Sequence, residues 1–344
     1  MKKTALITGG TGFIGTYLAK ALLKKGWKIK IVDLKYSNDP FLIKNCEIYK
    51  IDITKLKFNH TCFDGVNVIF HLAALPSISR KSKKIFLNNN LNGTRNIIKC
   101  AKKRAIKKII YTSSSTVYGI PKKAILDEKD AGNTIAFYGD SKWKAEKLLI
   151  NSTKKNFNVN ILRPRVVIGP GRLGIFGLLF KRILNNKNIY LIGNGSNYFQ
   201  FTNVNDFVDA CIKCIKLNKN IILNIGSKDR ISTYNLLKSL IKKNKSKSNI
   251  IKTPSLIIKK VLKILEFFGV SPLTKEQYAI ADKNFYLSTE KAESTIKWKS
   301  KISTLATLNE SYKWFKKNSK KNNQTKEIGI LTIFNNFQQS GFQK

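Results

Sequence analysis

Residues Lys2–Gly15 read KKTALITGGTGFIG, in which a short apolar strand, Ala5–Ile7, runs into a glycine-rich turn. Helical spacing follows at once in TYLAKALLKKG. A glycine-rich turn between a strand and a helix is typical of a dinucleotide-binding site, whereas the same glycines without that context are a weak signal. The order of these segments therefore predicts a turn that holds a pyrophosphate, with an ordinary strand-to-helix turn as the alternative.

Three glycines of this turn have separate tasks in such a site. Gly9 permits the tight turn, Gly12 leaves the backbone open to the pyrophosphate, and Gly15 lets helix and strand pack closely. Free N–H groups at the start of the helix would face the phosphates. A second strand, in WKIKIVDL, ends at Asp33, where an acidic residue would bind the ribose hydroxyls. A carboxylate there would repel a 2′-phosphate, so we expect NAD rather than NADP.

Short apolar strands continue to alternate with helical segments as far as residue 168. Further strands are expected over residues 47–51, 67–72, 107–112 and 158–162. This alternation predicts an α/β fold, a Rossmann-like, doubly wound parallel sheet. Ligands of such sheets bind beyond the carboxyl ends of the strands. The residues singled out by the sequence lie at those ends: Gly9, Asp33, Asp52, Ala73 and Ser114.

The character of the chain changes after Ile168, where GPGRLG interrupts the pattern. We expect an NAD-binding domain over residues 1–168, which residues 203–235 rejoin. Residues 169–202 and 236–315 are expected to form a smaller, substrate-binding lobe. Residues 316–344 begin with KKNSKKNNQTK, which is poor in apolar residues and predicts a disordered tail.

An amphipathic helix is expected over residues 254–270. Lys259, Lys260 and Lys263 are assigned to its polar side. A lid or core helix is favoured, and a membrane-surface helix is the alternative.

The chain of 344 residues carries a formal net charge of +44. Only eight of its 64 basic residues are arginines, and the lysines are scattered beside many Asn and Ile, as a bias towards A/T-rich codons would produce. Such a charge attracts polyanions nonspecifically. No recognition motif accompanies it, so we expect no specific nucleic-acid partner.

The few cysteines and histidines argue against a disulfide framework or a metal site. Five cysteines at irregular spacing predict free thiols, and the CxxC of Cys211 and Cys214 lies in a helical segment, where packing is favoured. The two histidines, His60 and His71, are too few for a histidine-based metal site. There is no apolar run of the length of a membrane span. The basic start, MKKTALITGG, has too short an apolar part for a signal peptide, so a cytoplasmic protein is expected.

The catalytic candidate is YGDSK, which opens a helix and places Tyr138 and Lys142 on one helical face. The lysine ammonium would favour loss of the phenol proton, so that Tyr138 can exchange a proton with a substrate. The preceding segment YTSSSTVYG follows a strand, and a serine there can hold a substrate hydroxyl or carbonyl. An exposed Tyr and Lys on an ordinary helix is the alternative, which the glycine turn and the serine segment disfavour.

These segments together resemble the extended short-chain dehydrogenases/reductases of the NAD-dependent epimerase/dehydratase family, which mostly act on nucleotide sugars. The resemblance covers residues 1–315 in family order: TGGTGFIG, Asp33, Asp52-Ile53, HLAA at 71–74, NLNGT at 90–94, SSSTVYG at 113–119, YGDSK at 138–142 and RPRVVIGPG at 163–171.

The resemblance implies NAD as cofactor and a role for each matching residue. Ser114, Tyr138 and Lys142 would be catalytic, Tyr138 as the acid/base. The implied cofactor-binding residues are Gly9, Gly12, Phe13, Ile14, Gly15, Asp33, Asp52, Ile53, Leu72, Ala73, Ala74, Asn90, Ser113, Tyr138 and Lys142. The substrate-binding candidates are Ser115, Arg165 and Arg172. A homodimer is also implied.

Departures from the family pattern narrow the expected reaction. Dehydratases of the family carry Asp-Glu where this chain has Ser115 and Thr116, and decarboxylases keep a Glu at the second position, so both reactions are disfavoured. Many epimerases have an Asn at Val166 and a diphosphate-binding Arg at Phe199, and a buried diphosphate without such a partner is costly. We expect an enzyme like the UDP-sugar 4-epimerases, with a hydroxysteroid-type or flavonol-type alcohol dehydrogenase as the alternative. An NAD-binding sensor without catalytic activity is the third hypothesis.

Overall fold

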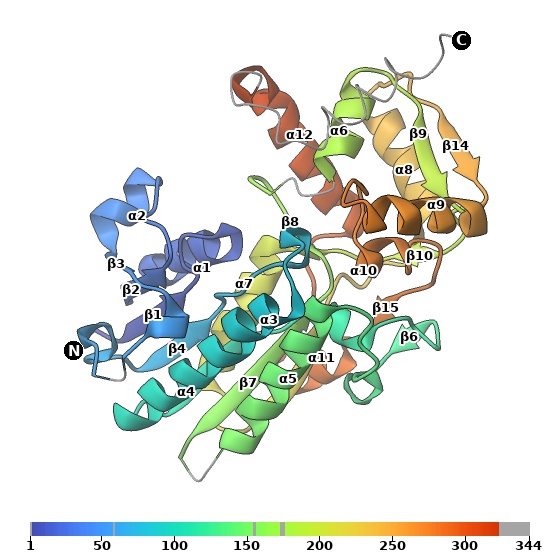
Figure 1. Ribbon diagram of the computed structural model, residues 1–344. Helices are drawn as coiled ribbons and strands as arrows, with labels where there is room; N and C mark the ends of the chain where they lie inside the picture. Colours follow the sequence, from blue (N-terminus) through green and yellow to red (C-terminus); the bar gives the residue numbers. More distant parts are fainter. Residues whose placement is uncertain (1, 58, 154–155, 173–175, 323–344) are drawn as a thin grey trace. The chain divides into compact units, whose positions relative to one another are not determined.

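The computed structural model describes residues 2–57, 59–153, 156–172 and 176–322 (Figure 1). The chain divides into two compact units. The first, here called the sheet unit, comprises residues 1–167, 200–230 and 285–304. The second, here called the lobe unit, comprises residues 168–199, 231–284 and the chain from residue 305.

Seven parallel strands form the sheet, in the spatial order β12-β7-β5-β4-β1-β2-β3. Thr8 lies opposite Val32 on one side and His71 on the other, so three strands end along one edge. The order runs outward in both directions from β1 and β4, which confirms the predicted doubly wound α/β fold. The strand bounds are β1 Thr4–Thr8, β2 Lys28–Asp33, β3 Glu47–Lys50, β4 Val68–His71, β5 Lys108–Thr112, β7 Asn158–Pro164 and β12 Ile221–Ile225.

Helices cover both faces of the sheet, because neighbouring residues of each buried strand point to opposite sides. Ile7 of β1 belongs to the core beneath α1 and α7, whereas Leu6 belongs to the core beneath α4 and α5. Trp298, fully buried, closes the first of these cores and donates its indole N–H to Asp206 O at 2.9 Å. The helix bounds are α1 Phe13–Lys24, α4 Gly93–Lys103, α5 Phe137–Ser152 and α7 Val204–Lys213.

Short elements connect the strands of the sheet unit. They are α2 Pro40–Asn45, α3 Lys83–Phe86, β6 Ile125–Leu126, β11 Thr202–Asn203, β15 Tyr286–Leu287 and α11 Glu290–Ile296, with β8 at Val167–Ile168. Turns of 3₁₀ helix span Ile53–Lys55, Thr61–Phe63, Ser77–Ser79, Ser115–Tyr118, Glu128–Asp130 and Cys214–Lys216, and a π-helical turn spans Leu87–Asn92.

The lobe unit has two small sheets and a separate aromatic core. Strands β9 and β14 pair in parallel, and β10 and β13 pair antiparallel. Phe180 of α6 is fully buried, with the rings of Tyr312 and Phe315 of α12 at 5.6 and 5.8 Å. The bounds are α6 Phe176–Leu184, β9 Ile189–Ile192, β10 Tyr198–Phe199, β13 Ile231–Ser232, α8 Thr233–Lys243, β14 Ile250–Thr253, α9 Ser255–Phe267, α10 Lys275–Tyr278 and α12 Thr304–Asn322.

Two boundaries differ from those expected from the sequence. Residues 285–304 belong to the sheet unit, because Trp298 and α11 pack into its core, whereas residues 231–235 belong to the lobe unit. The tail expected over residues 316–344 needs correction in its first part, since α12 is helical to Asn322 and its apolar residues Tyr312 and Phe315 pack into the lobe. Residues 323–344 lie outside the described residues.

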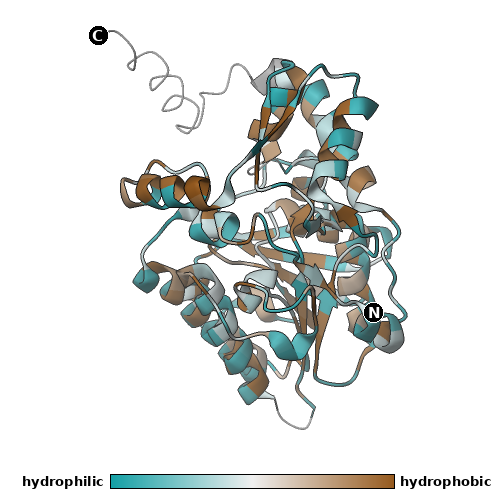
Figure 2. Cartoon of the chain, turned by 90° about the vertical axis from the view of Figure 1, so that its right-hand side faces the viewer, coloured by the Kyte–Doolittle hydropathy of each residue, from teal (hydrophilic) through white to brown (hydrophobic). Residues whose placement is uncertain are grey.

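The amphipathic helix expected over residues 254–270 forms α9, but it is not a core helix. Leu262 is its one buried residue. Most of its apolar side chains are exposed, and in Figure 2 its ribbon is mostly brown for hydrophobic residues.

Cys211 and Cys214 are buried free thiols in the core of the sheet unit, as the helical spacing predicts. Among the described residues there is no helix long and apolar enough to cross a membrane. The same part of the chain holds no group of three or more His, Cys, Asp and Glu side chains arranged to hold a metal ion.

Candidate active site

In the glycine turn between β1 and α1, two glycines leave no room for a side chain and a third lies beside open space. Gly9 has a φ of +70°, and a Cβ there would lie 2.8 Å from Ala73 N, so the turn requires glycine. A Cβ at Gly15 would overlap Gly9 O. A Cβ at Gly12 would meet only Gly9 O, at 3.2 Å, among the described residues. The backbone therefore presents an open surface beside Gly12, at the start of α1.

Asp33, at the end of β2, is attached to this turn. Its Oδ2 accepts hydrogen bonds from the N–H and the hydroxyl of Thr11, at 3.0 and 2.7 Å, and its Oδ1 accepts one from Leu34 N at 2.7 Å. The carboxylate is thus fixed beside the glycine turn and stays partly exposed. That is the position that an acidic residue needs for binding ribose hydroxyls.

Asp52 and Ile53 follow β3 and begin a 3₁₀ turn. Asp52 Oδ1 accepts a hydrogen bond from Thr54 N at 2.8 Å, and the Ile53 side chain packs over Gly93, where a Cβ would lie 2.6 Å from Ile53 Cδ1. The Asn96 amide donates to Ile53 O at 3.0 Å. Helix α4 therefore fixes the segment that the family resemblance assigns to the adenine.

His71 joins three elements behind the end of β4. Its Nδ1 lies 2.7 Å from Thr8 Oγ1, and its Nε2 lies 2.9 Å from Thr94 Oγ1. Burial lowers the pKa of His71 to about 3, so the ring is neutral at physiological pH. Thr8 also accepts a hydrogen bond from Ala73 N at 3.2 Å, which fixes the segment after β4, Leu72 to Ala74, beside the glycine turn. The sequence reading gave His71 no role, although it lies in the matching HLAA segment.

Asn90 links that same segment to the catalytic helix. It is buried in the π-helical turn Leu87–Asn92, and its Oδ1 accepts from Leu75 N at 2.7 Å. Its Nδ2 donates to Leu75 O at 3.2 Å and to Ser141 Oγ at 2.9 Å. Ser141 in turn donates to Tyr138 O at 2.7 Å. The amide of Asn90 therefore holds the first turn of α5, which carries Tyr138.

Two neighbouring serines follow β5. Ser114 is partly exposed, and its Oγ accepts from Thr116 N at 3.2 Å and from the Thr116 hydroxyl at 3.0 Å. Ser113 is buried, and its hydroxyl has no hydrogen-bond partner among the described residues. A buried hydroxyl without a partner is costly. Ser113 is therefore suited to a polar ligand at this strand end.

Lys142 reaches from α5 to the end of β5. The side chain is 2% exposed, its Nζ donates to Thr112 O at 2.6 Å, and it lies 4.2 Å from the centroid of the Tyr111 ring. Burial lowers the pKa of Lys142 to about 7, and the charge of Glu146 opposes that shift. Tyr138, one helical turn earlier, is partly exposed, with its ring 6.2 Å from that of Phe86. The structure thus brings Lys142 to the strand end from which Ser114 extends.

A buried polar network fixes the other side of α5. Arg163 of β7 is 1% exposed and binds both carboxylate oxygens of Glu146, the shortest contact being 2.6 Å. Its Nη1 donates to Tyr118 Oη at 3.1 Å and to Glu128 O at 2.6 Å. Two charges that are buried together must be paired and hydrogen-bonded to be tolerated. The network therefore holds α5 against β7 in a fixed position.

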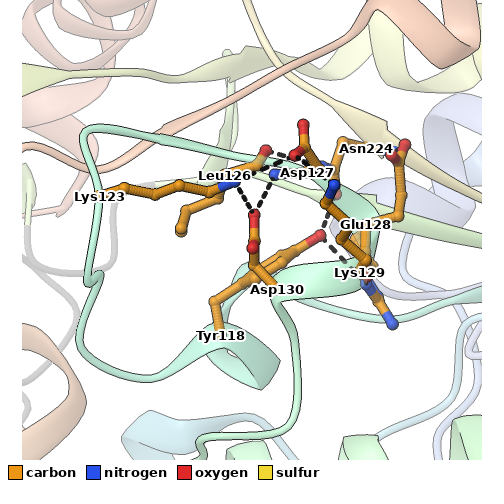
Figure 3. A network of polar contacts seen from close by, with 9 residues as sticks. Tyr118, Lys123, Leu126, Asp127, Glu128, Lys129, Asp130 and Asn224 are labelled. Carbon is orange, nitrogen blue, oxygen red and sulfur yellow. Dashed lines mark hydrogen bonds and ion pairs between the residues drawn. The ribbon is translucent and has the colours of Figure 1, made fainter.

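Figure 3 shows how the network continues into the segment after Ser114. Tyr118 Oη donates to Asn224 Oδ1 at 2.5 Å, and Asn224 N donates to Glu128 Oε1 at 2.8 Å. Lys123 bridges Asp127 and Asp130 at 3.0 and 2.8 Å. The sequence analysis missed these residues. Tyr118, Glu128 and Asn224 are brought together from separate elements, and the spacings of Lys123 with Asp127 and of Lys142 with Glu146 were the local signals.

The three substrate-binding candidates are divided between the units. Arg165 is 3% exposed in the sheet unit, stacks at 4.1 Å on the Phe285 ring, and donates to Ser115 Oγ at 3.4 Å. Burial lowers the pKa of Arg165 to about 9. Arg172 belongs to the lobe unit, where its N–H donates to Gly169 O at 3.2 Å. Whether these residues bind substrate stays a prediction.

This chain is similar to several known proteins. A model of the NAD dependent epimerase/dehydratase family matches residues 5–226. A UDP-N-acetyl-α-D-glucosaminuronate decarboxylase of Bacillus cytotoxicus is 33% identical over 74% of this chain and 84% of its own. The human sterol-4-α-carboxylate 3-dehydrogenase, decarboxylating, is 29% identical over 61% of this chain and 57% of its own.

The fold also matches that of a solved structure. A UDP-glucose 4-epimerase of Thermotoga maritima, solved with UDP-glucose, superposes with a TM-score of 0.76 at 23% identity. The match covers 92% of this chain and 99% of the epimerase. Almost the whole epimerase chain therefore has a counterpart here, including the region after residue 226 that the family model does not cover.

Proposed function

Because this chain belongs to the NAD-dependent epimerase/dehydratase family, we propose that it is a 4-epimerase of a nucleotide sugar. Its cofactor is NAD, and its reaction is hydride transfer at a hydroxyl-bearing carbon. The observation that carries the proposal is the arrangement at the end of β5. Lys142 of α5 donates a hydrogen bond to Thr112 O there, and Ser114 follows two residues later in the chain.

The residues of the sheet unit fit the cofactor. The backbone is open beside Gly12, where a pyrophosphate can approach the start of α1. Asp33 is held beside the same turn for the ribose hydroxyls. The buried Ser113 hydroxyl offers a polar group to the part of the cofactor at the strand end. Bound NAD supplies the acceptor and donor of the hydride.

The proposed proton transfers use side chains of α5 and of the segment after β5. Ser114 orients the substrate hydroxyl, and Tyr138 takes its proton as the carbon is oxidised. The Lys142 ammonium, one helical turn from Tyr138, stabilises the resulting phenolate. Once the ketone has turned over in the site, Tyr138 returns the proton to the oxygen as the carbon is reduced on its other face. The reaction then leaves no net change in the cofactor.

Two arguments support a nucleotide sugar and epimerisation. The nucleotide-sugar relative matches at higher identity and over a larger share of both chains than the sterol relative does. Both relatives are decarboxylating enzymes, however, and the family resemblance links sugar decarboxylation to a Glu at the position of Thr116. Thr116 cannot act as that acid, and its hydroxyl donates instead to Ser114. We therefore favour epimerisation, with a homodimer in the cytoplasm as the expected form.

Product analysis tests this proposal. The purified protein is incubated with NAD and, separately, with UDP-glucose, UDP-N-acetylglucosamine and UDP-glucuronate, and the anomeric signals are followed by proton NMR. We expect the 4-epimer of at least one of them, with no net NADH by absorbance. Ser114→Ala is the matched variant and should lose most of the turnover. Carbon dioxide release from UDP-glucuronate would indicate a decarboxylase instead of an epimerase. Net NADH in a further incubation with a sterol alcohol, without activity on the UDP-sugars, would indicate an alcohol dehydrogenase.

A further inference from the structure

Helix α9 of the lobe unit carries a largely apolar face that is exposed. Leu256, Ile257, Val261 and Ile264 are 77, 61, 44 and 58% exposed. Phe267 and Phe268, at its end, are 86 and 69% exposed, with their rings 5.4 Å apart. Single exposed apolar residues are ordinary, but a contiguous set of this size marks an interaction site.

The opposite face of α9 attaches the helix to the lobe. Leu262 is buried, Lys259 pairs with Asp282, and Glu266 accepts a hydrogen bond from Tyr278 Oη at 2.8 Å. Lys259 and Glu266 are thus directed inward, whereas most of the apolar side chains are exposed, which differs from an ordinary surface helix. The exposed face is therefore fixed in place by ion-pair and hydrogen-bond contacts on the inner side.

The charges of α9 are arranged for an anionic surface. Lys260 and Lys263 are exposed with the apolar face, whereas Glu266, the only acidic residue of the helix, is engaged by Tyr278 and by Lys275 N at 3.0 Å. Long lysine side chains can lie along an apolar surface while their ammonium groups reach polar headgroups. Lys260 lies on the apolar face, four residues from both Leu256 and Ile264, and an exposed apolar face with lysines whose ammonium groups can reach headgroups fits a helix that lies in a membrane interface.

We propose that α9 is a membrane-surface anchor, which lays Leu256, Ile264, Phe267 and their neighbours onto an anionic phospholipid bilayer. This role is separate from the reaction at Tyr138. The other occupant to consider is a second copy of the chain. Two α9 faces packed together would bring the Lys260 ammonium groups into one apolar interface without an exposed carboxylate of the helix to pair with them, which is costly. The net charge of +44 likewise favours an anionic partner over a second copy.

Vesicle sedimentation with the full chain tests the proposal. The vesicles are phosphatidylcholine alone and phosphatidylcholine mixed with phosphatidylglycerol. The variant Phe267→Ser/Phe268→Ser keeps the charge of the chain and removes the two rings at the end of α9, so it separates apolar insertion from the general attraction of a basic protein. The matched control, Tyr36→Ser/Ile43→Ser, removes side chains of 63 and 58% exposure in the sheet unit.

We expect the parent chain to bind the anionic vesicles and the variant Phe267→Ser/Phe268→Ser to bind them at least about tenfold more weakly. The control should bind like the parent. Lys260→Gln/Lys263→Gln should lose the preference for anionic over neutral vesicles. In about 1 M salt, where the Debye length is about 3 Å, part of the parent's binding should survive through its apolar contacts.

Three results would overturn the proposal. The first is vesicle binding that is unchanged by Phe267→Ser/Phe268→Ser, because the attraction would then come from charge elsewhere on the chain. The second is a change of oligomeric state in that variant, measured by analytical ultracentrifugation without loss of vesicle binding, because a second copy would then cover the face. The third is a large fall of its melting temperature, because the rings would then be packed against the chain itself.

Discussion

The polar core around α5 and the outer face of α9 depart from the usual distribution of side chains in opposite directions. Around α5, groups that are normally exposed are buried: Lys142 is 2%, Glu146 0% and Arg163 1% exposed. On α9, groups that are normally buried are exposed, up to 86% for Phe267.

A buried polar group and an exposed apolar patch are both informative, because each costs free energy that an ordinary core or surface avoids. The first kind of departure holds α5, which carries the candidate catalytic residues, in one geometry. The second leaves an apolar surface exposed among the described residues, which is the basis of the proposed anchor. The comparison predicts large effects on activity and stability at the first region, and effects on association alone at the second.

The largest effect is expected at the residue that the polar core positions. Tyr138→Phe removes the phenol proposed to exchange the proton and should lower kcat by about 10²- to 10⁴-fold, while NAD affinity stays nearly unchanged. Steady-state turnover and NAD titration by fluorescence measure the two effects. Tyr190→Phe, in the lobe unit and 62% exposed, is the control. Turnover equal to that of the parent would remove Tyr138 from the mechanism.

The polar core itself should be sensitive to the loss of one partner. Arg163→Met leaves the buried Glu146 carboxylate unpaired and should destabilise the sheet unit by about 3–5 kcal/mol. Adding Glu146→Gln removes the uncompensated charge and should restore part of the loss, which a double-mutant cycle by urea unfolding can measure. If the single variant lost less than about 1 kcal/mol, the pair would not be holding α5.

Lys142 should make stability depend on pH in a defined direction. Its pKa is lowered to about 7 in the folded chain, below the ordinary 10.5, so between these values the unfolded chain binds the additional proton. Stability should therefore rise with pH from about 7 to 10.5. Relative to Lys142→Met, the parent should gain about 2 to 3 kcal/mol between pH 7 and pH 9. If the unfolding free energy changed by the same amount between pH 7 and pH 9 in the parent and in Lys142→Met, the result would contradict the burial of the Lys142 charge.

The sequence predicted the sheet and the elements on which the candidate site residues lie, because both depend on local signals. The glycine turn lies between one strand and the next helix, Asp33 ends a strand, and Tyr138 and Lys142 lie one helical turn apart, so each signal spans only a few residues. The contacts of Arg163 with Glu146, and of Tyr118 with Asn224, join residues from separate elements, and no local pattern indicates them.

Helix α9 is a second case in which local sequence patterns could not predict the contacts. Its periodicity predicts two faces, and the sequence reading placed Lys259, Lys260 and Lys263 on one polar side. In the structure Lys259 turns inward to Asp282, while Lys260 and Lys263 are exposed with the apolar residues. Which face is buried depends on Asp282 and Tyr278, which lie beyond the helix, so the periodicity of α9 alone could not decide it.

A smaller effect is expected at the glycine turn, where the Asp33 carboxylate accepts hydrogen bonds from Thr11 and is expected to bind the ribose hydroxyls. Asp33→Asn keeps an oxygen that can accept from Thr11 but removes the charge beside the ribose, so NAD should bind about tenfold more weakly and the discrimination against NADP should relax. Thr11→Val removes the hydroxyl contact with Asp33 Oδ2 while the backbone N–H contact and the charge stay, and should keep the preference for NAD. Calorimetric titration with both cofactors measures the ratio. Equal affinities in the parent protein would show that Asp33 does not set the preference.

The smallest effect on stability should come from Phe267 and Phe268, the most exposed aromatic rings among the described residues. Phe267→Ser/Phe268→Ser removes side chains that are 86 and 69% exposed, so little apolar area returns to water when they are lost. Its unfolding free energy should stay within about 0.5 kcal/mol of the parent value. Leu262→Ser, on the inner face of the same helix and 6% exposed, should cost more than about 1 kcal/mol, because it places a hydroxyl in a buried apolar site. Equal losses for the inner and outer substitutions would mean that both faces of α9 are packed. The outer face of α9 would then not be an exposed surface, and both the contrast with the polar core and the proposed membrane anchor would lose their basis.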